Sequence, residues 1–334
     1  MADLDALVTG IAHEQAFSGA VRVDADGSTS EWAFGLADRR HGVANTANTR
    51  FGIASGTKGF TALTVMSLIE SGELRLDLPV RAVLGDDLAE IDASVTVEHL
   101  LGHRSGIGDY LDESQGGDIN DYAMPLPVYE MSGTEHYVPA LGGHPQVSMP
   151  GERFAYNNSG FVVLAVIAER VGRMPFERLV AKRVCGPAGM TETYFLRSDE
   201  LPVDVAVGYL APDGLRTNVF HLPVVGSGDG GIISSAADMQ RFWAAIYAGR
   251  IVSPEAISLM TTPRSDAPAE GLRYGLGFWL ALQGPAVMLE GYDAGVSFRT
   301  VHDPSRNLTH TTLSNTSGGA WPMTKALDQA LDIA

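Results

Sequence analysis

Residues 52–60 read Gly-Ile-Ala-Ser-Gly-Thr-Lys-Gly-Phe, and an apolar run with helical spacing follows them as far as Gly72. A glycine is common where a helix ends, so the pattern predicts a helix over residues 55–71. Ser55 lies at the start of this helix and Lys58 three residues later, so both side chains leave the same face. A hydroxyl held one turn from an amine is a nucleophile beside a base. The spacing therefore predicts a serine that is acylated during catalysis.

The composition is typical of a folded, globular protein. The chain has 334 residues, of which 45% are hydrophobic and 19% charged, and its formal net charge is -17. This charge disfavours nucleic acid and anionic membranes as partners, because both attract basic surfaces. Cys185 is the only cysteine, so no disulfide within the chain is expected. Neither a signal-peptide pattern nor an apolar span occurs, so we expect a cytoplasmic protein, with its oligomeric state left open.

Strand patterns occur near both ends of the chain, and helical patterns lie between them. A hairpin is predicted around Asp26 and Gly27. Further strands are expected at residues 274–282, 286–289, 296–302 and 308–314, and further helices at 3–15, 161–171, 237–248 and 322–331. This order predicts an α+β protein with one sheet built from both termini and an inserted helical unit. We place the sheet domain at residues 1–80 and 225–334, and the mostly helical domain with long loops at 81–224.

A second candidate motif occupies residues 150–160, which read PGERFAYNNSG. Tyr156 within it offers a phenol that can carry a proton, and Asn158 offers an amide that can orient a lysine or a substrate. Either residue alone is more typical of ordinary packing. Their occurrence in the same chain as the Ser55 and Lys58 pair makes a catalytic interpretation the stronger one.

Four segments taken in order resemble the serine β-lactamase and penicillin-binding-protein superfamily. The similarity is to its class C-like branch of esterases, D-amino-acid peptidases and β-lactamases, and it covers nearly the whole chain. Residues 51–78 are similar to the family's Ser-x-x-Lys helix and the Leu-x-Leu-Asp-x-Pro that follows it, and residues 96–107 are similar to its HLL-x-H-x-SG segment. Residues 150–160 are similar to its PG-x-x-F-x-Y-x-N segment, and residues 230–242 to its GG-x-x-S-x-A-D-x-x-R-F segment. The resemblance implies an antiparallel sheet flanked by helices, with a mostly helical inserted domain.

The resemblance also implies a role for each matching residue. Ser55 would be the nucleophile, Lys58 its proton partner, Tyr156 a general base for acylation or deacylation, and Asn158 a positioning residue. The backbone N–H of Ser55 would supply one donor of an oxyanion hole, and a late strand the second. The division of work between Lys58 and Tyr156 stays open. No metal or organic cofactor is expected.

The third family motif, Lys-Thr-Gly or His-x-Gly on a late strand, has no clear match. The best candidate is residues 291–298, GYDAGVSF. In this alignment Tyr292 replaces the basic residue, Asp293 takes the middle position, and Gly295 supplies the second oxyanion donor through its N–H. Strand alternation places Tyr292 and Asp293 on opposite faces, so only one of them would line the pocket unless a bulge intervenes.

Loss of this cation affects both the base and the substrate. A phenol has a pKa near ~10, so a tyrosine base at neutral pH requires about 4 kcal/mol of preferential stabilisation of its anion. Nearby cations supply such stabilisation, and this site has one fewer. The cation would also attract the carboxylate of a penicillin or a D-alanyl peptide. We therefore expect an uncharged ester or amide, ahead of a lactam, as the small-molecule substrate.

Several alternatives remain beside this serine hydrolase. A true β-lactamase, a D-amino-acid peptidase and an acyltransferase share every motif, and a non-catalytic binding protein with this fold is an alternative of another class. His99 and His103 have the spacing of a helical zinc site, but no third ligand follows. Residues 226–231 lack a phosphate-loop pattern and are expected to line the pocket. Five aromatic residues either wall an acyl pocket or simply pack: Tyr110, Tyr122, Tyr129, Tyr137 and Trp279.

Overall fold

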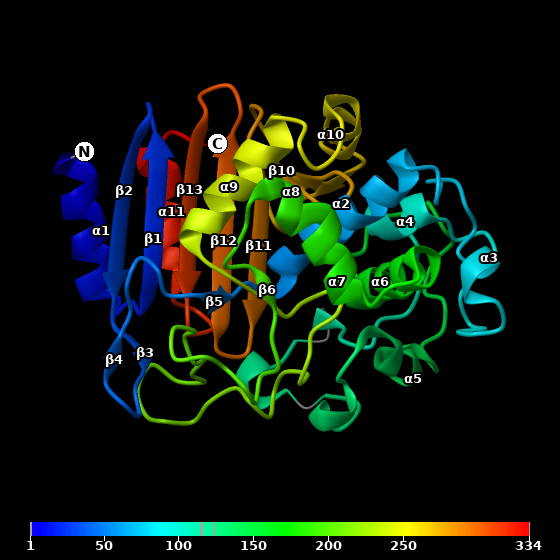
Figure 1. The fold of residues 1–334 in the computed structure, drawn as a ribbon, viewed down its shortest axis with the longest axis horizontal. Helices are drawn as coiled ribbons and strands as arrows, with labels where there is room; N and C mark the ends of the chain where they lie inside the picture. The colour runs from blue at the N-terminus through cyan, green and yellow to red at the C-terminus, as the bar shows by residue number, and fades with distance from the viewer. Residues whose placement is uncertain (1, 114–115, 123, 334) are drawn as a thin grey trace.

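The computed structural model describes residues 2–113, 116–122 and 124–333. Within these residues the main sheet has eight strands, and all neighbouring pairs are antiparallel (Figure 1). Their order across the sheet is β2 (Ser28–Phe34), β1 (Gly19–Ala25), β13 (Leu308–Ser314), β12 (Val296–Asp303), β11 (Val287–Asp293), β10 (Trp279–Ala281), β9 (Leu272–Tyr274) and β8 (Ser265–Ala267). Both ends of the chain contribute strands, which confirms the predicted α+β class and sheet composition.

The other described elements are helices and short strands. The helices are α1 (Ala2–Glu14), α2 (Thr57–Glu70), α3 (Arg81–Leu84), α4 (Val97–Leu101), α5 (Val138–Leu141), α6 (Asn158–Gly172), α7 (Phe176–Val180), α8 (Gly186–Ala188), α9 (Ala236–Tyr247), α10 (Pro254–Met260) and α11 (Ala320–Ala330), with a 3-10 turn η1 (Ala54–Gly56) before α2. The short strands are β3 (Leu36–Asp38) and β4 (Val43–Ala44), which pair, and β5 (Phe51–Gly52), β7 (Ile232–Ser234) and β6 (Tyr194–Phe195), which form a second sheet.

The N-terminal hairpin joins directly to the C-terminal strands. Asp26 and Gly27 both adopt left-handed conformations, with φ of 53° and 73°, and a two-residue turn of this kind matches the twist of the strands that it connects. The other edge of β1 pairs with β13, where Val21 lies opposite Thr312. In Figure 1 the blue strands β2 and β1 lie beside the red strand β13.

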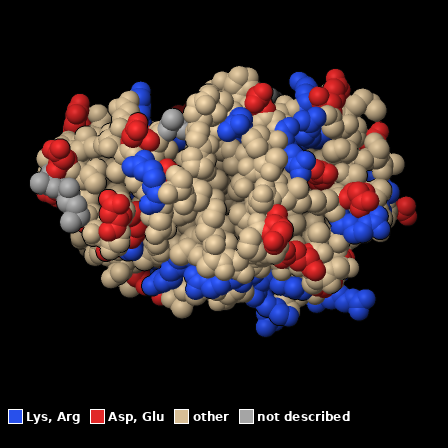
Figure 2. Space-filling view, turned by 90° about the horizontal axis from the view of Figure 1, so that it is seen from above, with Lys and Arg blue, Asp and Glu red and all other residues tan. Residues whose placement is uncertain are grey.

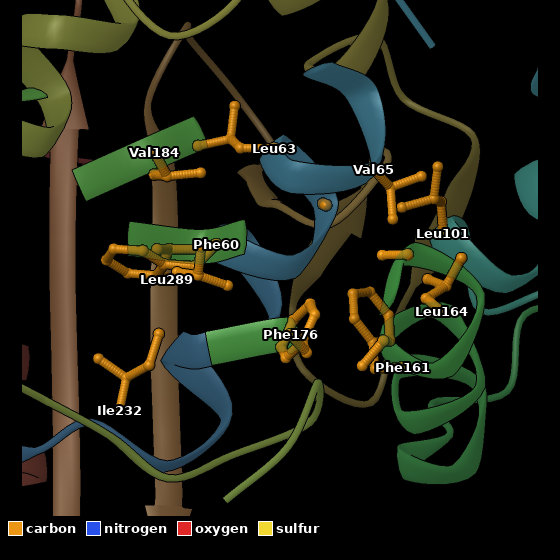
Figure 3. Packing of buried hydrophobic residues seen from close by; sticks show 14 of the residues in the cluster. Phe60, Leu63, Val65, Leu101, Phe161, Leu164, Phe176, Val184, Ile232 and Leu289 are labelled. Carbon is orange, nitrogen blue, oxygen red and sulfur yellow. The ribbon is translucent and has the colours of Figure 1, made fainter. Parts of the chain in front are cut away.

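Helices cover both faces of the sheet. α1 and α11 pack on one face over a cluster that includes Val8 and Leu327. α9 and the start of α2 lie on the other face, where Figure 3 shows Phe60 of α2 packed beside Leu289 of β11. α2 also contacts α6 and α7, so it is buried from all sides along most of its length. This packing fixes the start of α2 against the sheet.

Two expectations about strands differ from the structure. The strand expected at 274–282 is wrong, because β9 and β10 form a hairpin there. The chain turns at Gly275 and Gly277: a Cβ on Gly275 would meet the Met260 carbonyl oxygen at 2.1 Å, and Gly277 has a φ of +86°. The short strands β5, β6 and β7 were not expected, since two or three residues carry too little periodicity to indicate a strand.

The inserted unit is visible as a change in secondary structure. α3 to α8 all lie between residues 81 and 224, and β6 is the one named strand in the described part of that segment. The division into domains at 1–80, 81–224 and 225–334 stays a prediction. In the described residues no helix is long and apolar enough to cross a membrane. On the face in Figure 2, the middle is largely uncharged, basic side chains follow the lower edge, and acidic side chains are scattered toward the two ends.

β11 passes unusually close to η1, and Gly291 makes this possible. A Cβ at Gly291 would lie 2.0 Å from the Ile53 carbonyl oxygen and 2.9 Å from the Ser55 nitrogen. Both neighbours are backbone atoms, which cannot rotate away as a side chain can. The glycine therefore sets the distance between the sheet and the turn that carries Ser55.

We expect Gly291→Ala to lower the free energy of unfolding by about 1–3 kcal/mol, because η1 must shift to admit the methyl group. Denaturant unfolding followed by circular dichroism measures this change. Gly10→Ala in α1 is the matched control, since nothing lies within 4 Å of its Cβ position, and it should stabilise the chain by up to about 1 kcal/mol. An unchanged unfolding midpoint for Gly291→Ala would contradict the close approach.

Candidate active site

Ser55 lies in η1, directly before α2. The preceding residue, Ala54, has a φ of +44°, a left-handed conformation that is uncommon for a residue with a side chain. This sharp turn leaves Ser55 half-buried at the junction of two hollows. One is a cavity of about 120 Å³, and the other is a wider groove of about 990 Å³.

The Lys58 amino group joins three separate parts of the chain. Its Nζ lies 2.8 Å from Ser55 Oγ, 2.7 Å from Asn158 Oδ1 and 3.0 Å from the Asp229 carbonyl oxygen. The side chain is buried, with 2% exposure. The structure thus brings together Ser55, Lys58 and Asn158, and adds the residue 229 carbonyl that the sequence patterns did not indicate.

The amide of Asn158 has a defined orientation. Its Nδ2 donates to the Leu111 carbonyl oxygen at 2.9 Å and to Glu113 Oε1 at 2.9 Å, which leaves Oδ1 to face Lys58. The backbone N–H of Asn158 donates to Asp109 Oδ2 at 2.7 Å, at the start of α6. Asp109 and Glu113 are therefore site residues that sequence reasoning missed, because they lie in a glycine-rich loop without a recognisable pattern.

Four carboxyl groups lie around Lys58, and they differ in how far they are buried. Burial lowers the pKa of Lys58, while Asp229, Glu113, Asp109 and Asp293 act in the opposite direction. Burial also raises the pKa of Asp109 to about 6, although two backbone N–H groups of α6 oppose the shift. The side chain of Asp229 accepts a hydrogen bond of 2.6 Å from the Tyr110 hydroxyl, so its carboxyl has a specific partner of its own beside Lys58.

Tyr156 is held among aromatic rings at the edge of the groove. Its ring stacks on Trp279 with centroids 5.8 Å apart and an interplanar angle of 11°, and Lys58 Nζ lies 4.9 Å from its centroid. Burial raises the pKa of Tyr156 well above its usual value, and a hydrogen bond with Ser55 only partly opposes this. The surroundings of Tyr156 thus favour a neutral phenol, which is the reverse of what a tyrosine base requires.

The assignment of Gly295 to the oxyanion hole is wrong. Its N–H donates to Ser317 Oγ at 2.8 Å, because Gly295 lies in the turn between β11 and β12 with a φ of +65°. Gly291 is the glycine that lies against the Ser55 backbone. Counting back two positions from Gly291, the residue in place of the family's cation is Leu289, which packs in the core against Gly59 of α2.

Tyr292 and Asp293 both border the cavity, contrary to the strict alternation expected of a strand. They lie at the end of β11, where Asp293 Oδ1 accepts the Ala294 N–H of the turn at 2.8 Å. The Tyr292 side chain is 45% exposed and borders the groove as well. Burial raises the pKa of Asp293 to about 7, and repulsion by Glu113 adds to this.

The aromatic residues divide between the two hollows. Tyr110, Tyr122 and Tyr137 line the cavity, and Trp279 lines the groove. Tyr129 is 70% exposed and borders neither hollow, so it plays no part in either wall. The loop at residues 226–231 contributes Gly226, Asp229, Gly230 and Gly231 to the cavity, which confirms its expected place beside the pocket.

His99 and His103 both use a ring nitrogen in a hydrogen bond within the protein. His99 Nδ1 accepts the Thr96 N–H at 3.2 Å in a capping box, and His103 Nδ1 accepts the Asn157 N–H at 3.0 Å. Across the residues with described positions, no three His, Cys, Asp or Glu side chains are grouped to hold a metal ion.

Comparison with known proteins places this site in a family. The Beta-lactamase family matches residues 4–334. The chain is 30% identical to esterase EstB of Burkholderia gladioli, over 99% of this chain and 94% of that protein. It is 28% identical to a putative penicillin-binding protein, PbpX, of Bacillus subtilis, over 84% of this chain and only 66% of that protein's length. A penicillin-binding protein crystal structure from Bacillus halodurans superposes with a TM-score of 0.90 at 32% identity, over 97% and 99% of the two chains. The chain belongs to the Beta-lactamase family.

Proposed function

We propose that the protein is a serine hydrolase that cleaves an uncharged ester or amide through an acyl-Ser55 intermediate. The observation that carries the proposal is the set of three contacts around Lys58 Nζ. It provides a nucleophile, a base and the groups that orient the base. The relationship to an esterase over almost the full length of both chains supports the same activity.

The contacts of Lys58 suit a neutral amine that accepts the proton of Ser55. Asn158 Oδ1 and the Asp229 carbonyl oxygen can only accept hydrogen bonds, and a neutral amine has two N–H bonds to give them. Its lone pair then points toward the third neighbour, Ser55 Oγ, at 2.8 Å. Burial supports this state, because it lowers the pKa of Lys58.

Tyr292 is our candidate for the second oxyanion donor. The connection between β11 and β12 has two residues, so Asp293 and Val296 form the hydrogen-bonded pair that closes the hairpin. Tyr292 and Ser297 then form a non-hydrogen-bonded pair, and the Tyr292 N–H points away from β12, toward the side where η1 lies. Together with the Ser55 N–H it would face the carbonyl oxygen of a bound acyl group.

Tyr156 serves in this mechanism as a neutral proton carrier. Ser55 Oγ bonds to the substrate carbonyl carbon as its proton passes to Lys58. The bond to the leaving group then breaks as the Tyr156 hydroxyl gives that group a proton and Lys58 passes its extra proton to the Tyr156 oxygen, so both side chains are neutral in the acyl-enzyme. Water then takes the place of the leaving group, and the same groups act in reverse to release the acid. Since Tyr156 borders the groove and not the cavity, the leaving group would lie in the groove and the acyl group in the cavity.

The charges around the site favour an uncharged substrate. Leu289 stands in place of a cation, and Asp293 and Asp229 border the cavity that would hold the acyl group. A true β-lactamase, a D-amino-acid peptidase and an acyltransferase use the same groups and remain alternatives. The non-catalytic alternative is disfavoured by the contacts of Lys58. A cytoplasmic location stays a prediction.

A fluorophosphonate probe should add one phosphonyl group to the chain, because it reacts with an activated serine nucleophile. Intact-mass spectrometry detects the added mass. We expect no labelling of Ser55→Ala and full labelling of Ser258→Ala, a remote and exposed control serine. Labelling that persists in Ser55→Ala would mean that another residue is the nucleophile, and an unlabelled native chain would favour a binding protein.

We expect short p-nitrophenyl esters to be hydrolysed with a kcat/KM about a hundredfold above that for benzylpenicillin, since no cation is present to bind the penicillin carboxylate. Steady-state kinetics on the two substrates, with Ser55→Ala as the background, gives the ratio. Rapid benzylpenicillin turnover without ester hydrolysis would overturn the preference for uncharged substrates.

The discrimination against an anionic acyl group should grow with pH. Asp293 has a pKa of about 7, so it is mostly neutral at pH 6 and mostly ionised at pH 8, where it repels a second carboxylate. The kcat/KM ratio of p-nitrophenyl hydrogen succinate to p-nitrophenyl butyrate should therefore fall by several-fold to about tenfold over this range. A change in the protonation of Lys58 alters kcat/KM for both esters and therefore cancels in the ratio. In Asp293→Asn the ratio should be flat, and an equal slope in that variant would exclude Asp293 as the cause.

A further inference from the structure

The residues on either side of Tyr156 are both held by His103. The Ala155 N–H donates to the His103 carbonyl oxygen at 2.9 Å, and the Asn157 N–H donates to His103 Nδ1 at 3.0 Å. Residues 153–157 belong to no helix or strand, so no ladder of regular hydrogen bonds fixes the Tyr156 backbone. One residue therefore supplies both of these anchors.

The ring of His103 also contacts the ring of Tyr156. Their centroids are 4.4 Å apart with an interplanar angle of 34°, and the imidazole lies 4.9 Å from Phe161, the other ring near the Lys58 ammonium. His103 is 1% exposed, so its position is set by packing on all sides. The backbone and the ring of Tyr156 thus depend on the same neighbour.

The chemistry of the imidazole is consistent with this function. Because Nδ1 accepts the Asn157 N–H, the proton of the neutral ring resides on Nε2, which is buried and has no hydrogen-bond partner among the described residues. Burial and the charge of Lys58 lower the pKa of His103 well below its usual value. The ring therefore stays neutral, and Nδ1 stays available as an acceptor.

The backbone conformation explains how one residue reaches both flanks. His103 has a φ of +52°, in the left-handed region that only a few non-glycine residues adopt. This turn directs its carbonyl group and its side chain to the same neighbouring segment. A residue with a negative φ would not be expected to make both the backbone contact to Ala155 and the side-chain contact to Asn157.

We propose that His103 is a positioning residue that holds the Tyr156 phenol in register with Ser55. The inference rests on the proposed function, because it matters only if Tyr156 carries the proton of the leaving group. His103 lines neither hollow, so its effect on the reaction would pass through Tyr156. Displacement of a reacting group by about 1 Å is enough to slow catalysis by as much as a hundredfold.

Two substitutions separate the anchors. His103→Asn keeps an acceptor close to the place of Nδ1 and tolerates a positive φ, but it removes the ring contact. His103→Phe keeps a ring and leaves the buried Asn157 N–H without a partner. We expect kcat for an ethyl ester, whose alkoxide leaving group needs a proton, to fall on the order of 10-fold to 100-fold in His103→Phe and by less in His103→Asn. KM should change by less than about twofold in both, since ester binding in the two hollows is untouched.

A control histidine distinguishes positioning from general stability. His302 is also buried, stacks on Trp243 at 5.6 Å and shares a hydrogen bond of 2.8 Å with Thr309 through Nδ1, but it borders neither hollow. His302→Asn should lower the melting temperature and leave kcat unchanged. All kcat values are expressed per Ser55 that reacts with the fluorophosphonate, so unfolded molecules do not contribute.

A double-mutant cycle with Tyr156→Phe gives the decisive result. If His103 acts through the phenol, adding His103→Asn to Tyr156→Phe should cause no further loss of kcat. Losses that multiply, or single variants with native kcat, would overturn the proposal. An unlabelled native chain would instead refute the proposed function itself.

Nitrogen NMR of the native protein with labelled histidines measures the protonation of the His103 ring directly. This test does not depend on whether any variant folds. The signals of His103 should show an unprotonated Nδ1 and no titration down to pH 5. A proton on Nδ1, or titration near neutral pH, would also overturn the proposal.

Discussion

The site depends on one buried amine that satisfies three parts of the chain at once. Lys58 lies on α2, and its partners come from η1, from the start of α6 and from the loop before β7. A buried lysine without partners costs several kcal/mol. The three segments that supply its partners are therefore held together around the amine. Ser55, Lys58 and the amide of Asn158, the proposed nucleophile, base and orienting group, are therefore one structural unit, and the sheet and helices serve as its frame.

Much of this arrangement follows from local sequence. The spacing of Ser55 and Lys58 needs only the geometry of a helix, and the hairpin at Asp26 needs only the preferences of a turn. The third motif could not be assigned from local sequence, because nothing in the sequence distinguishes the role of Gly291 from that of Gly295. Only the approach of β11 to η1 shows that the first of them touches the nucleophile's backbone while the second closes a turn. Contacts between distant segments carry no local signal, and the same applies to Asp109 and Glu113.

The replacement of a cation by Leu289 changes what the remaining groups can do. Burial favours the neutral form of Tyr156 and lowers the pKa of Lys58, so in the proposed mechanism Lys58 accepts the first proton. The surrounding carboxyl groups oppose the loss of a proton from Lys58, but their own burial keeps several of them closer to neutrality. The chemistry thus rests on the balance between desolvation and charge, more than on any single ion pair.

The pairing of β1 with β13 has a consequence for how the protein is made. The hydrogen bond between Ser18 and Asn315 joins residues 297 positions apart, so the sheet cannot close until the segment that carries β13 has left the ribosome. Until then the hairpin of β1 and β2 has an open edge that can pair with a strand from another chain. The interval between the synthesis of the first strand and of the last is therefore the period in which this protein is most exposed to misassembly.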